Sequence, residues 1–499
     1  MKGFRLRMFA VALLMLIAAA TPAISQQWIP LVNQPNPLLG LSNPLLLTDG
    51  TVIAHEACGS TWWRLTPDPS GSYVNGAWKR IASLPAGYAP LYFGSAVLSD
   101  GRVIMEGGEY NFNGQTCKPV WTNRGAIYNP KTNVWRSVTP PTRWKTIGDA
   151  QGVVLADGTY LQANCCTKQQ ALLNSKTLNW TITGKGKFDV NDEEGWTLLP
   201  DGTVLTVDAY VFQYDADGRN YEIYDPAKRV WTSGAASGTI VQLWDSYPDA
   251  RHASYEVGPA VLRPDGTVFY TGATGAPGTP GHTAIYDTHT QSWTAGPDFP
   301  DGQDIADGPA ALLPNGNVLM QTSPGVFNLG SKFYEWDGSI FRNVTAGNTD
   351  APVISSYYGN MLLLPTGEVL WTDFGNVWVF RPNGHPQPEW APQIVSVPTD
   401  ITRGKSYVVS GFNFNGFSQG AAYGDDSQAA TNYPLVRITN RITLNVYYAR
   451  THDHSTMAVA FSGGVFTNFD VPRNMESGLS DFEVVCNGIA SPAVTVNVH

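Results

Sequence analysis

TLLPDGTVL, residues 197–205, contains two short apolar segments on either side of a turn at Asp201 and Gly202. Asp-Gly or Asn-Gly between alternating apolar residues predicts a β-hairpin, because the primed two-residue turns that join adjacent strands need positive φ values. The same pattern occurs seven times in the chain, at spacings of 44 to 64 residues. A repeat of this length predicts one supersecondary unit per period. The turn glycines are Gly50, Gly101, Gly158, Gly202, Gly266, Gly316 and Gly367.

A second hairpin pattern follows most of these turns and ends in tryptophan. It reads YNPKTNVW from Tyr128, NSKTLNW from Asn174, YDPAKRVW from Tyr224 and YDTHTQSW from Tyr286. Two hairpins per period of about 50 residues give four strands, the size of one propeller blade, and each tryptophan can pack between neighbouring sheets. The sequence therefore predicts an all-β fold in which residues 26–390 form a seven-bladed β-propeller.

The repeat ends in a proline-rich stretch, RPNGHPQPEWAPQ, which predicts a linker. The chain then alternates apolar and polar residues in KSYVVSGFNF, ITLNVYYARTH and DFEVVCNGI, without the blade pattern. We predict that residues 391–499 form an immunoglobulin-like β-sandwich.

The first 25 residues have the composition of a signal peptide. Lys2, Arg5 and Arg7 precede the apolar run MFAVALLMLIAAA, and AIS before Gln26 suits a cleavage site. The run is short for a membrane anchor, so we expect a secreted or periplasmic protein with no membrane insertion after cleavage. A formal net charge of −10 without a basic cluster argues against nucleic acid or an anionic membrane as a partner. We expect a monomer whose partner is a small molecule or a polysaccharide.

Five cysteines, an odd number, leave at least one thiol unpaired within the chain. Export permits disulfides, and Cys58 with Cys117 is a candidate bridge between neighbouring repeats. Cys165 and Cys166 are either a vicinal disulfide or two thiols on opposite faces of a strand, and both interpretations stay open.

The strand before each turn glycine is expected to line the central channel of the propeller. Residues about nine or ten positions before the glycine then stand at the channel mouth. Counting back in this way brings carboxylates and tyrosines to one place. The positions are Tyr92 in the second repeat, Asp149 in the third, Asp192, Glu193 and Glu194 in the fourth, Tyr255 and Glu256 in the fifth, Asp304 and Asp307 in the sixth, and Tyr357 and Tyr358 in the seventh.

Converging carboxylates repel one another unless a cation or protons neutralise them. The ring of carboxylates is therefore a candidate site for calcium or another hard divalent cation, or for a protonated carboxylic acid in acid/base chemistry. Tyrosines beside carboxylates also suit the hydroxyls and ring faces of sugars. The plain alternative is a solvated acidic rim on an acidic protein.

The C-terminal part contains a second candidate site in YARTHDHST. His452 and His454 alternate along a predicted strand, so both are expected on one face, where they are a weak candidate for a shared metal. Two surface histidines are the alternative. Residues 421–437 are polar, contain Asp425 and Asp426, and predict a long loop able to meet either site.

The YDPAKRVW-type hairpins, YYGNMLLLPTG from Tyr357 and AYGDDSQ from Ala422 carry a resemblance to a known family. The chain resembles the galactose oxidase and glyoxal oxidase family of secreted kelch-like propellers with a C-terminal early-set domain. The resemblance covers nearly all of the chain after residue 25. It implies a copper-radical oxidase, in which a Cys-crosslinked Tyr, a second Tyr and two His hold one copper that oxidises alcohols or aldehydes.

Residue by residue, most of that implied copper site is missing. Tyr357 matches the axial tyrosine, but Tyr358 stands where the adjacent copper histidine belongs. Asp149 stands at the crosslinked tyrosine, Gly94 at its cysteine partner, and Gln428 at the loop histidine. Only one of four ligands is kept, so copper is not expected, whereas Asp, Gln and neutral Tyr suit hard cations or sugars.

We therefore expect an exported propeller that binds a glycan or polyol at its acidic and aromatic channel mouth. One alternative is an enzyme, either a divergent alcohol or aldehyde oxidase that recruits His452 and His454, or a carboxylate-based hydrolase or lyase. Another is a protein-interaction scaffold without a small-molecule site. The candidate ligand-binding residues are Tyr92, Asp149, Glu193, Glu256, Asp307, Tyr357, Tyr358 and Gln428.

Overall fold

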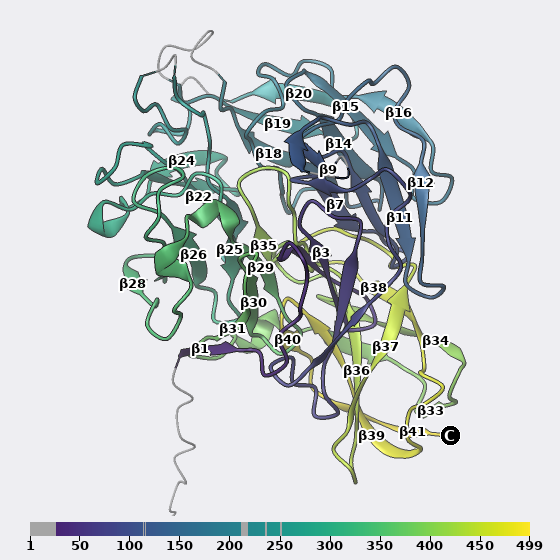
Figure 1. The fold of residues 1–499 in the computed structure, drawn as a ribbon. Coiled ribbons are helices and arrows are strands. Elements are labelled where there is room, and N and C mark those ends of the chain that lie inside the picture. The colour runs from purple at the N-terminus through teal and green to yellow at the C-terminus, as the bar shows by residue number, and fades with distance from the viewer. Residues whose placement is uncertain (1–25, 113, 115, 211–217, 235–236, 250–251) are drawn as a thin grey trace, which may run out of the picture.

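The computed structural model describes residues 26–112, 114, 116–210, 218–234, 237–249 and 252–499. The predicted signal peptide lies outside these residues. Seven four-stranded antiparallel sheets surround a common centre, and the first strands of neighbouring sheets contact one another there (Figure 1). The chain is thus an all-β, seven-bladed propeller with a C-terminal β-sandwich. From the innermost strand outward, the seven blades are β2 (Leu41–Leu46), β3 (Val52–Glu56), β4 (Trp62–Thr66), β5 (Ala77–Arg80); β7 (Gly94–Val97), β8 (Val103–Glu106), β11 (Gly125–Asn129), β12 (Val134–Val138); β13 (Gly152–Val154), β14 (Tyr160–Asn164), β15 (Gln169–Leu173), β16 (Trp180–Thr183); β17 (Thr197–Leu198), β18 (Val204–Val207), β19 (Tyr221–Asp225), β20 (Val230–Ser233); β21 (Ala260–Leu262), β22 (Thr267–Thr271), β23 (Thr283–Asp287), β24 (Ser292–Ala295); β25 (Ala310–Leu312), β26 (Val318–Thr322), β27 (Lys332–Trp336), β28 (Phe341–Asn343); and β29 (Asn360–Leu363), β30 (Val369–Thr372), β31 (Val377–Arg381), β1 (Gln27–Pro30).

The seven hairpin turns share one geometry, and it differs from the primed turn that the sequence predicts. The glycines have φ between 74° and 87°, whereas the residue before each glycine does not have positive φ. The Gly202 N–H donates to the Leu199 carbonyl at 2.9 Å, which makes a type I turn followed by a left-handed glycine. The Asp201 carboxylate accepts the N–H of Thr203 at 3.0 Å and so stabilises this three-residue loop.

The tryptophans of the outer hairpins pack between blades, as predicted. The ring of Trp135 in β12 lies 5.2 Å from that of Trp62 in β4 of the preceding blade. Trp293 in β24 lies 5.3 Å from Tyr221 in β19. These outer hairpins are therefore buried against neighbouring blades, and each of two large apolar clusters extends over several blades.

The N-terminal strand closes the ring. β1 is the outermost strand of the seventh blade, where Gln27 pairs with Arg381 and Pro30 pairs with Trp378, and it lies beside β31 in Figure 1. Trp28 in this strand packs on Phe333 of the sixth blade, with ring centroids 4.1 Å apart. The first and last propeller segments thus complete one sheet.

The C-terminal sandwich has its own core of buried residues from both layers, among them Val409, Ile438, Phe469 and Phe482. β37 pairs with β38 of one layer and β36 of the other. The strands are β32 (Gln393–Ser396), β33 (Asp400–Ile401), β34 (Ser406–Phe412), β36 (Leu435–Asn440), β37 (Val446–His452), β38 (Val465–Asp470), β39 (Gly478–Cys486), β40 (Ile489–Ala490) and β41 (Val494–Val498).

A segment of the C-terminal part enters the centre of the propeller. Its short strand β35 (Ala421–Ala422) pairs with β25 and adds a fifth strand to the sixth blade, and Figure 1 shows β35 beside β25. The Gln419 side chain accepts the N–H of Leu198 in the fourth blade at 2.8 Å. The Ser427 hydroxyl donates to the Asn43 side chain of the first blade at 2.8 Å. The first part of the loop predicted at 421–437 therefore lies at the propeller centre, whereas the prediction was wrong at its end, because the residues from Leu435 belong to strand β36 of the sandwich.

Short elements complete the fold. Cys58, after β3, forms a disulfide with Cys117, which lies in a small sheet of β6 (Pro90–Leu91), β9 (Tyr110–Phe112) and β10 (Cys117–Pro119). Four 3-10 helices are described, η2 (Pro300–Gly302), η3 (Ala351–Val353), η4 (Ser356–Tyr358) and η5 (Pro388–Trp390). Within the described ranges, no helix has the length and apolarity needed to span a membrane.

Glu106 in β8 is a buried acid outside the candidate site, and it allows a pH-dependent test of the fold. Both of its carboxylate oxygens lack hydrogen-bond partners, and burial raises its pKa well above the ordinary value. An acid with a raised folded-state pKa loses stability as pH rises from its unfolded-state pKa through its folded-state pKa. Glu106→Met should therefore increase the free energy of unfolding by about 1–3 kcal/mol at pH 8, and by less at pH 5. Chemical unfolding at both pH values measures this, and an equal gain at both would contradict the assignment.

Candidate functional site

Two groups of three carboxylates lie at the centre of the propeller. In the first, here the Asp425 triad, one oxygen each from Asp149, Asp425 and Asp426 lie within 4.8 Å of one another. In the second, the Glu256 triad, the same holds for Glu193, Glu256 and Asp307. Four of these residues precede the innermost strands of the third to sixth blades, and two come from the C-terminal loop. The structure thus brings together the predicted Asp149, Glu193, Glu256 and Asp307.

Unusual backbone geometry positions part of the site. Tyr92, Glu193 and Asp307 each lie nine residues before a turn glycine and have positive φ values of 50°, 55° and 37°. Left-handed backbone is strained for such residues and persists where the surrounding structure enforces it, often at functional sites. The same bend therefore recurs at the same position in three blades.

Gly424 lets the C-terminal loop approach the blades. A Cβ at this position would lie 2.5 Å from Asp307 Oδ1, 2.8 Å from the Val257 carbonyl and 3.0 Å from the Asp307 Cα. Only glycine fits there without moving backbone atoms. The next two residues, Asp425 and Asp426, are thereby held against the blade carboxylates.

The site has a deep layer and a more accessible layer. Glu256, Asp425 and Asp426 are buried, with exposed fractions of 5%, 2% and 2%, whereas Asp149, Glu193 and Asp307 are half-buried. Five of the six carboxylates have a buried oxygen without a hydrogen-bond partner, the exception being Glu193. Buried polar atoms are nearly always paired in folded proteins, so these unpaired oxygens mark the carboxylates as a candidate ligand site.

Burial and mutual repulsion hold the pKa values of these acids high. Burial, followed by the charge of Asp425, raises the pKa of Asp149, of Glu193 and of Asp307 well above the ordinary value. The two triads are adjacent, because Gly424, the residue before Asp425, lies against Asp307 of the Glu256 triad. Burial, followed by the charge of Asp307, likewise raises the pKa of Glu256.

Tyrosines surround the carboxylates. Tyr357 and Tyr358 lie in η4, with ring centroids 4.1 Å apart, and the Tyr423 hydroxyl donates to the Tyr357 carbonyl at 2.8 Å. Burial, followed by the charge of Asp307, raises the pKa of Tyr92 well above its ordinary value, so its phenol stays neutral. The half-buried rings of Tyr92, Tyr357 and Tyr358 give the mouth aromatic faces beside carboxylate acceptors.

Three residues proposed from the same register lie elsewhere. Glu194 pairs with Lys187 in a different cluster. Asp304 accepts the backbone N–H groups of Gly275 and Gly325 at 3.0 and 3.2 Å and so holds loops. Tyr255 packs against Trp244, with ring centroids 5.3 Å apart.

Gln428 supports the loop that carries the carboxylates. Its side-chain amide donates to the Asp425 carbonyl at 3.3 Å, and the residue is buried. Gln428 thus contacts the backbone of the loop at Asp425.

The two C-terminal histidines have separate partners. His452 contacts Asp453 at 2.7 Å and Asp470 at 3.3 Å, whereas His454 contacts the Thr467 hydroxyl at 2.8 Å. Burial lowers the pKa of His454 to about 3, so it is neutral. Asp453, with φ of 52°, breaks the alternation that the sequence suggested. Neither histidine belongs to a group of three potential ligands among the described residues.

A third carboxylate group contains its own cation. Lys187 is completely buried and lies 3.1 Å from Glu194 and 3.5 Å from Asp208, and it also hydrogen-bonds Glu222. The Glu194 carboxylate also accepts the side-chain N–H of Gln151 at 2.9 Å, two residues after Asp149. The sequence analysis did not predict this network, which lies next to the site and connects the third and fourth blades.

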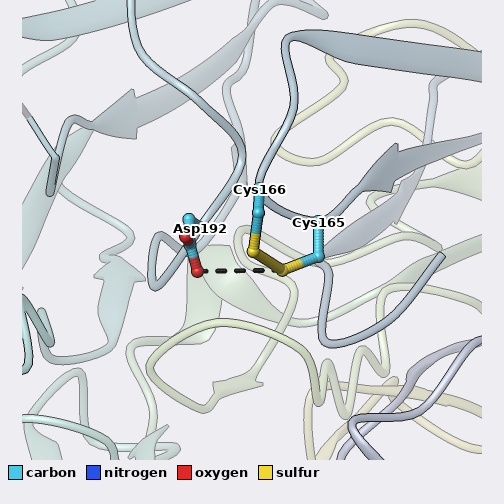
Figure 2. Close-up of side chains that lie close together, drawn as sticks. All are labelled: Cys165, Cys166 and Asp192. Atoms are coloured by element: carbon cyan, nitrogen blue, oxygen red, sulfur yellow. Dashed lines mark hydrogen bonds between the residues drawn. A yellow bond between two sulfur atoms is a disulfide. The ribbon is translucent and has the colours of Figure 1, made fainter. Parts of the chain in front are cut away.

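Cys165 and Cys166 form a vicinal disulfide beside Asp192, as Figure 2 shows. The Cys165 sulfur lies 3.7 Å from an Asp192 carboxylate oxygen, and burial, followed by the charge of Asp425, raises the Asp192 pKa to about 7. The Cys165 N–H donates to Ile147 and the Cys166 N–H to Asn191, both at 2.8 Å. These acceptors each lie two residues before a triad member, so the disulfide turn ties the two loops together. Cys486 is a free, buried thiol.

Residues that the sequence register missed also contribute. Glu109 lies in the insertion between β8 and β11, and burial, followed by the charge of Asp425, raises its pKa to about 7. Tyr110 faces Tyr92, with ring centroids 6.0 Å apart. The only sequence signal for Glu109 and Tyr110 was that an acidic and an aromatic residue directly follow the two glycines after strand β8.

The donor atoms at the centre differ from those that hold copper in the resembled family. None of the potential ligand groups found among the described residues includes a histidine. The central donors are carboxylate oxygens with neutral phenols nearby, a set typical of calcium, magnesium or manganese rather than Cu(II). The residues present therefore do not fit a copper-radical centre.

A separate cleft of about 740 Å³ lies between the first blade and the sandwich. Arg64, Arg450 and Asp470 line it, and none of the six central carboxylates does. Arg450 pairs with Asp470 at 3.1 Å. Arg64 donates to the Tyr128 hydroxyl at 2.9 Å, and none of the potential ligand groups found among the described residues lies in this cleft, so the candidate site remains the propeller centre.

Gly424→Ala tests the close approach of the C-terminal loop. The added methyl group must displace backbone atoms, and overpacking of this kind costs about 1–3 kcal/mol. Gly464→Ala is the matched control, because its nearest heavy atom lies 4.0 Å away. Thermal unfolding should show a clear loss for the first variant and none for the second. Equal stability of both variants would contradict the contact.

Comparison with known proteins supports the fold. No family model and no curated protein matches the chain. A fungal alcohol oxidase of the AA5 family, solved in complex with copper, is 13% identical with a TM-score of 0.52, over 95% of this chain and 99% of that chain. A streptogramin B lyase is 10% identical with a TM-score of 0.47, over 72% of this chain and 98% of that chain. At this identity the likeness to the oxidase, a galactose oxidase relative, establishes the fold alone: a galactose-oxidase-like propeller with a C-terminal sandwich.

Proposed function

We propose that this chain is an exported binding protein that holds a glycan or polyol at the centre of its propeller, without copper-radical chemistry. The observation that carries the proposal is the set of unpartnered carboxylate oxygens beside half-buried tyrosine rings at one mouth. Carboxylates accept hydrogen bonds from hydroxyl groups, and tyrosines offer a rigid apolar face with a polar end. Both features suit a polyhydroxylated ligand.

The basic and apolar composition of residues 1–25 supports export, and so do the two disulfides. Disulfides form and persist in oxidising compartments such as the periplasm and the extracellular space. The absence of histidine from the central donor set supports the loss of copper chemistry among the described residues.

A titration of the purified protein with soluble polysaccharides, oligosaccharides and alditols tests binding. We expect one class to bind, and Tyr357→Ala and Glu193→Gln each to weaken that binding at least tenfold. Asp298→Asn is the control, since this exposed carboxylate pairs only with His282 among the contacts described. Failure of every class to bind, or binding unchanged in both site variants, would contradict the proposal.

Copper reconstitution, followed by a peroxide assay on alcohols and aldehydes, tests the second half of the proposal. We expect no stoichiometric copper and no peroxide. Peroxide production by a copper-loaded protein would make the chain an oxidase. Hydrolysis of a bound glycan, detected by release of reducing ends, would instead identify a carboxylate-based hydrolase.

A further inference from the structure

One buried group of acids in this chain has a positively charged partner within the protein. In the cluster around Lys187, three carboxylates contact one ammonium group, and all of these side chains are fully buried. A buried charge needs such a partner, because the cost of removing it from water is several kcal/mol. Lys187 offsets one negative charge of this cluster, and burial raises the pKa values of Glu194 and Asp208 well above the ordinary value, which favours their protonated forms.

The two central triads lack a comparable partner. None of their six carboxylates makes an ion pair with a lysine, arginine or histidine in the part of the chain that the structure describes. In the deep layer, Glu256 Oε2, Asp425 Oδ2 and Asp426 Oδ1 also lack hydrogen-bond partners, although these residues are at most 5% exposed. Each triad thus presents a buried oxygen to which none of the described residues donates a hydrogen bond.

The spacing of the oxygens matches the requirements of a hard divalent cation. Calcium binds oxygens at about 2.3–2.6 Å, so two oxygens on one ion lie no more than about 5 Å apart. The ligand oxygens within each triad satisfy this limit, since all lie within 4.8 Å of one another. Carboxylate-only donors favour calcium, magnesium or manganese over softer metals.

The six oxygens form two groups, each with its own centre. A single cation in one triad would leave the three acids of the other without a positive partner. We propose that the propeller centre holds two divalent cations of the calcium class, one in the Asp425 triad and one in the Glu256 triad. This inference goes beyond the proposed function, because it concerns what neutralises the site whether or not a glycan is present.

The position of the triads also gives the cations a route to a ligand. Asp149, Glu193 and Asp307 are half-buried, so each triad has at least one member that is partly exposed to solvent. Calcium takes six to eight oxygen ligands, and three carboxylates leave coordination positions for water or hydroxyl groups. The cations therefore lie between the deep acids and the tyrosine-lined opening.

Calcium titration of the full chain from residue 26, freed of metal with a chelator, tests the proposal. Calorimetry and metal analysis after gel filtration should both give two calcium ions per chain. Terbium, which binds calcium sites, should show emission excited through the neighbouring tyrosines. None of these three readouts depends on catalytic activity or on the identity of the glycan.

Two variants test whether each triad holds one of the two ions. Asp426→Asn removes one charge from the Asp425 triad, and Glu256→Gln removes one from the Glu256 triad, so each should retain one tightly bound ion and bind the other at least tenfold more weakly. Asp373→Asn is the matched control, because this buried carboxylate accepts the Gly375 N–H at 2.8 Å and belongs to neither triad. It should still bind two ions.

Two ions in the unmodified chain, with one affected in each triad variant, support the proposal. One ion or none in the unmodified chain overturns it, even if both variants fail to fold. Two ions unchanged in both triad variants overturn the assignment to these residues. Glycan binding by a protein that takes up no calcium would overturn this inference and leave the proposed function intact, whereas two bound ions without glycan binding would do the reverse.

Discussion

Lys187→Met should lower the free energy of unfolding by about 3–5 kcal/mol, because removing one partner of a buried ion pair leaves uncompensated charge. Lys187 contacts Glu194, Asp208 and Glu222, and these three side chains are fully buried. Without the ammonium group, the acids must take up protons to remain buried. The loss should therefore be larger at pH 8 than at pH 5, and thermal unfolding at both pH values measures it.

Lys332→Met is the control for this prediction. Lys332 pairs with Asp301 at 2.9 Å on a more exposed part of the surface, where ion pairs contribute about 0–1 kcal/mol. If Lys187→Met does not yield folded protein, Lys187→Met with Glu222→Gln removes one of the stranded charges and should recover part of the stability. Wild-type stability of the single variant at pH 8 would contradict the role of Lys187.

Trp28→Ala should cost about 3–5 kcal/mol, the range for removing a large buried aromatic side chain. Trp28 is 5% exposed, and its indole N–H donates to the Val344 carbonyl at 2.9 Å. Its ring lies 4.1 Å from Phe333 and 5.0 Å from Phe380. The substitution opens a cavity where the N-terminal strand joins the sixth and seventh blades, and chemical unfolding measures the loss.

Val32→Ala, two residues after β1, controls for changes in the same segment, since Val32 is 69% exposed. It should leave stability within about 0.5 kcal/mol of the unmodified protein. A small loss in Trp28→Ala, similar to that of the control, would show that β1 contributes little to ring closure.

The repeat made the fold predictable, because each blade repeats a local signal. TLLPDGTVL and its relatives encode the inner hairpin, and the aromatic ends of YDPAKRVW and YDTHTQSW encode the packing between blades. The turn type was predicted wrongly, since the aspartate stabilises a type I turn through the N–H two residues later, which leaves only the glycine left-handed. The Asp-Gly pair alone does not show which of these two turns forms, because the choice depends on whether the aspartate side chain accepts that N–H.

The register also located four of the six carboxylates of the candidate site. Counting back from the turn glycines found Asp149, Glu193, Glu256 and Asp307 because the blades repeat. It did not separate Glu193 from Glu194, since a left-handed bend at Glu193 sends the two side chains to different clusters. Asp425 could not be placed, because its loop has no periodicity and its position depends on contacts with several blades.

The carboxylate site belongs to both parts of the chain, since Asp425 and Asp426 come from the C-terminal segment and the other four acids from the blades. Anything that binds across both sets is therefore linked to how the two parts dock, because binding free energy and docking free energy are reciprocal. A ligand that contacts both sets makes separation of the sandwich from the propeller harder by its own binding free energy, RT ln(1 + [L]/Kd). Conversely, a force that pulls the sandwich away from the propeller lowers the affinity of the site for the ligand. The fraction of occupied sites therefore depends on the force that acts between the two parts.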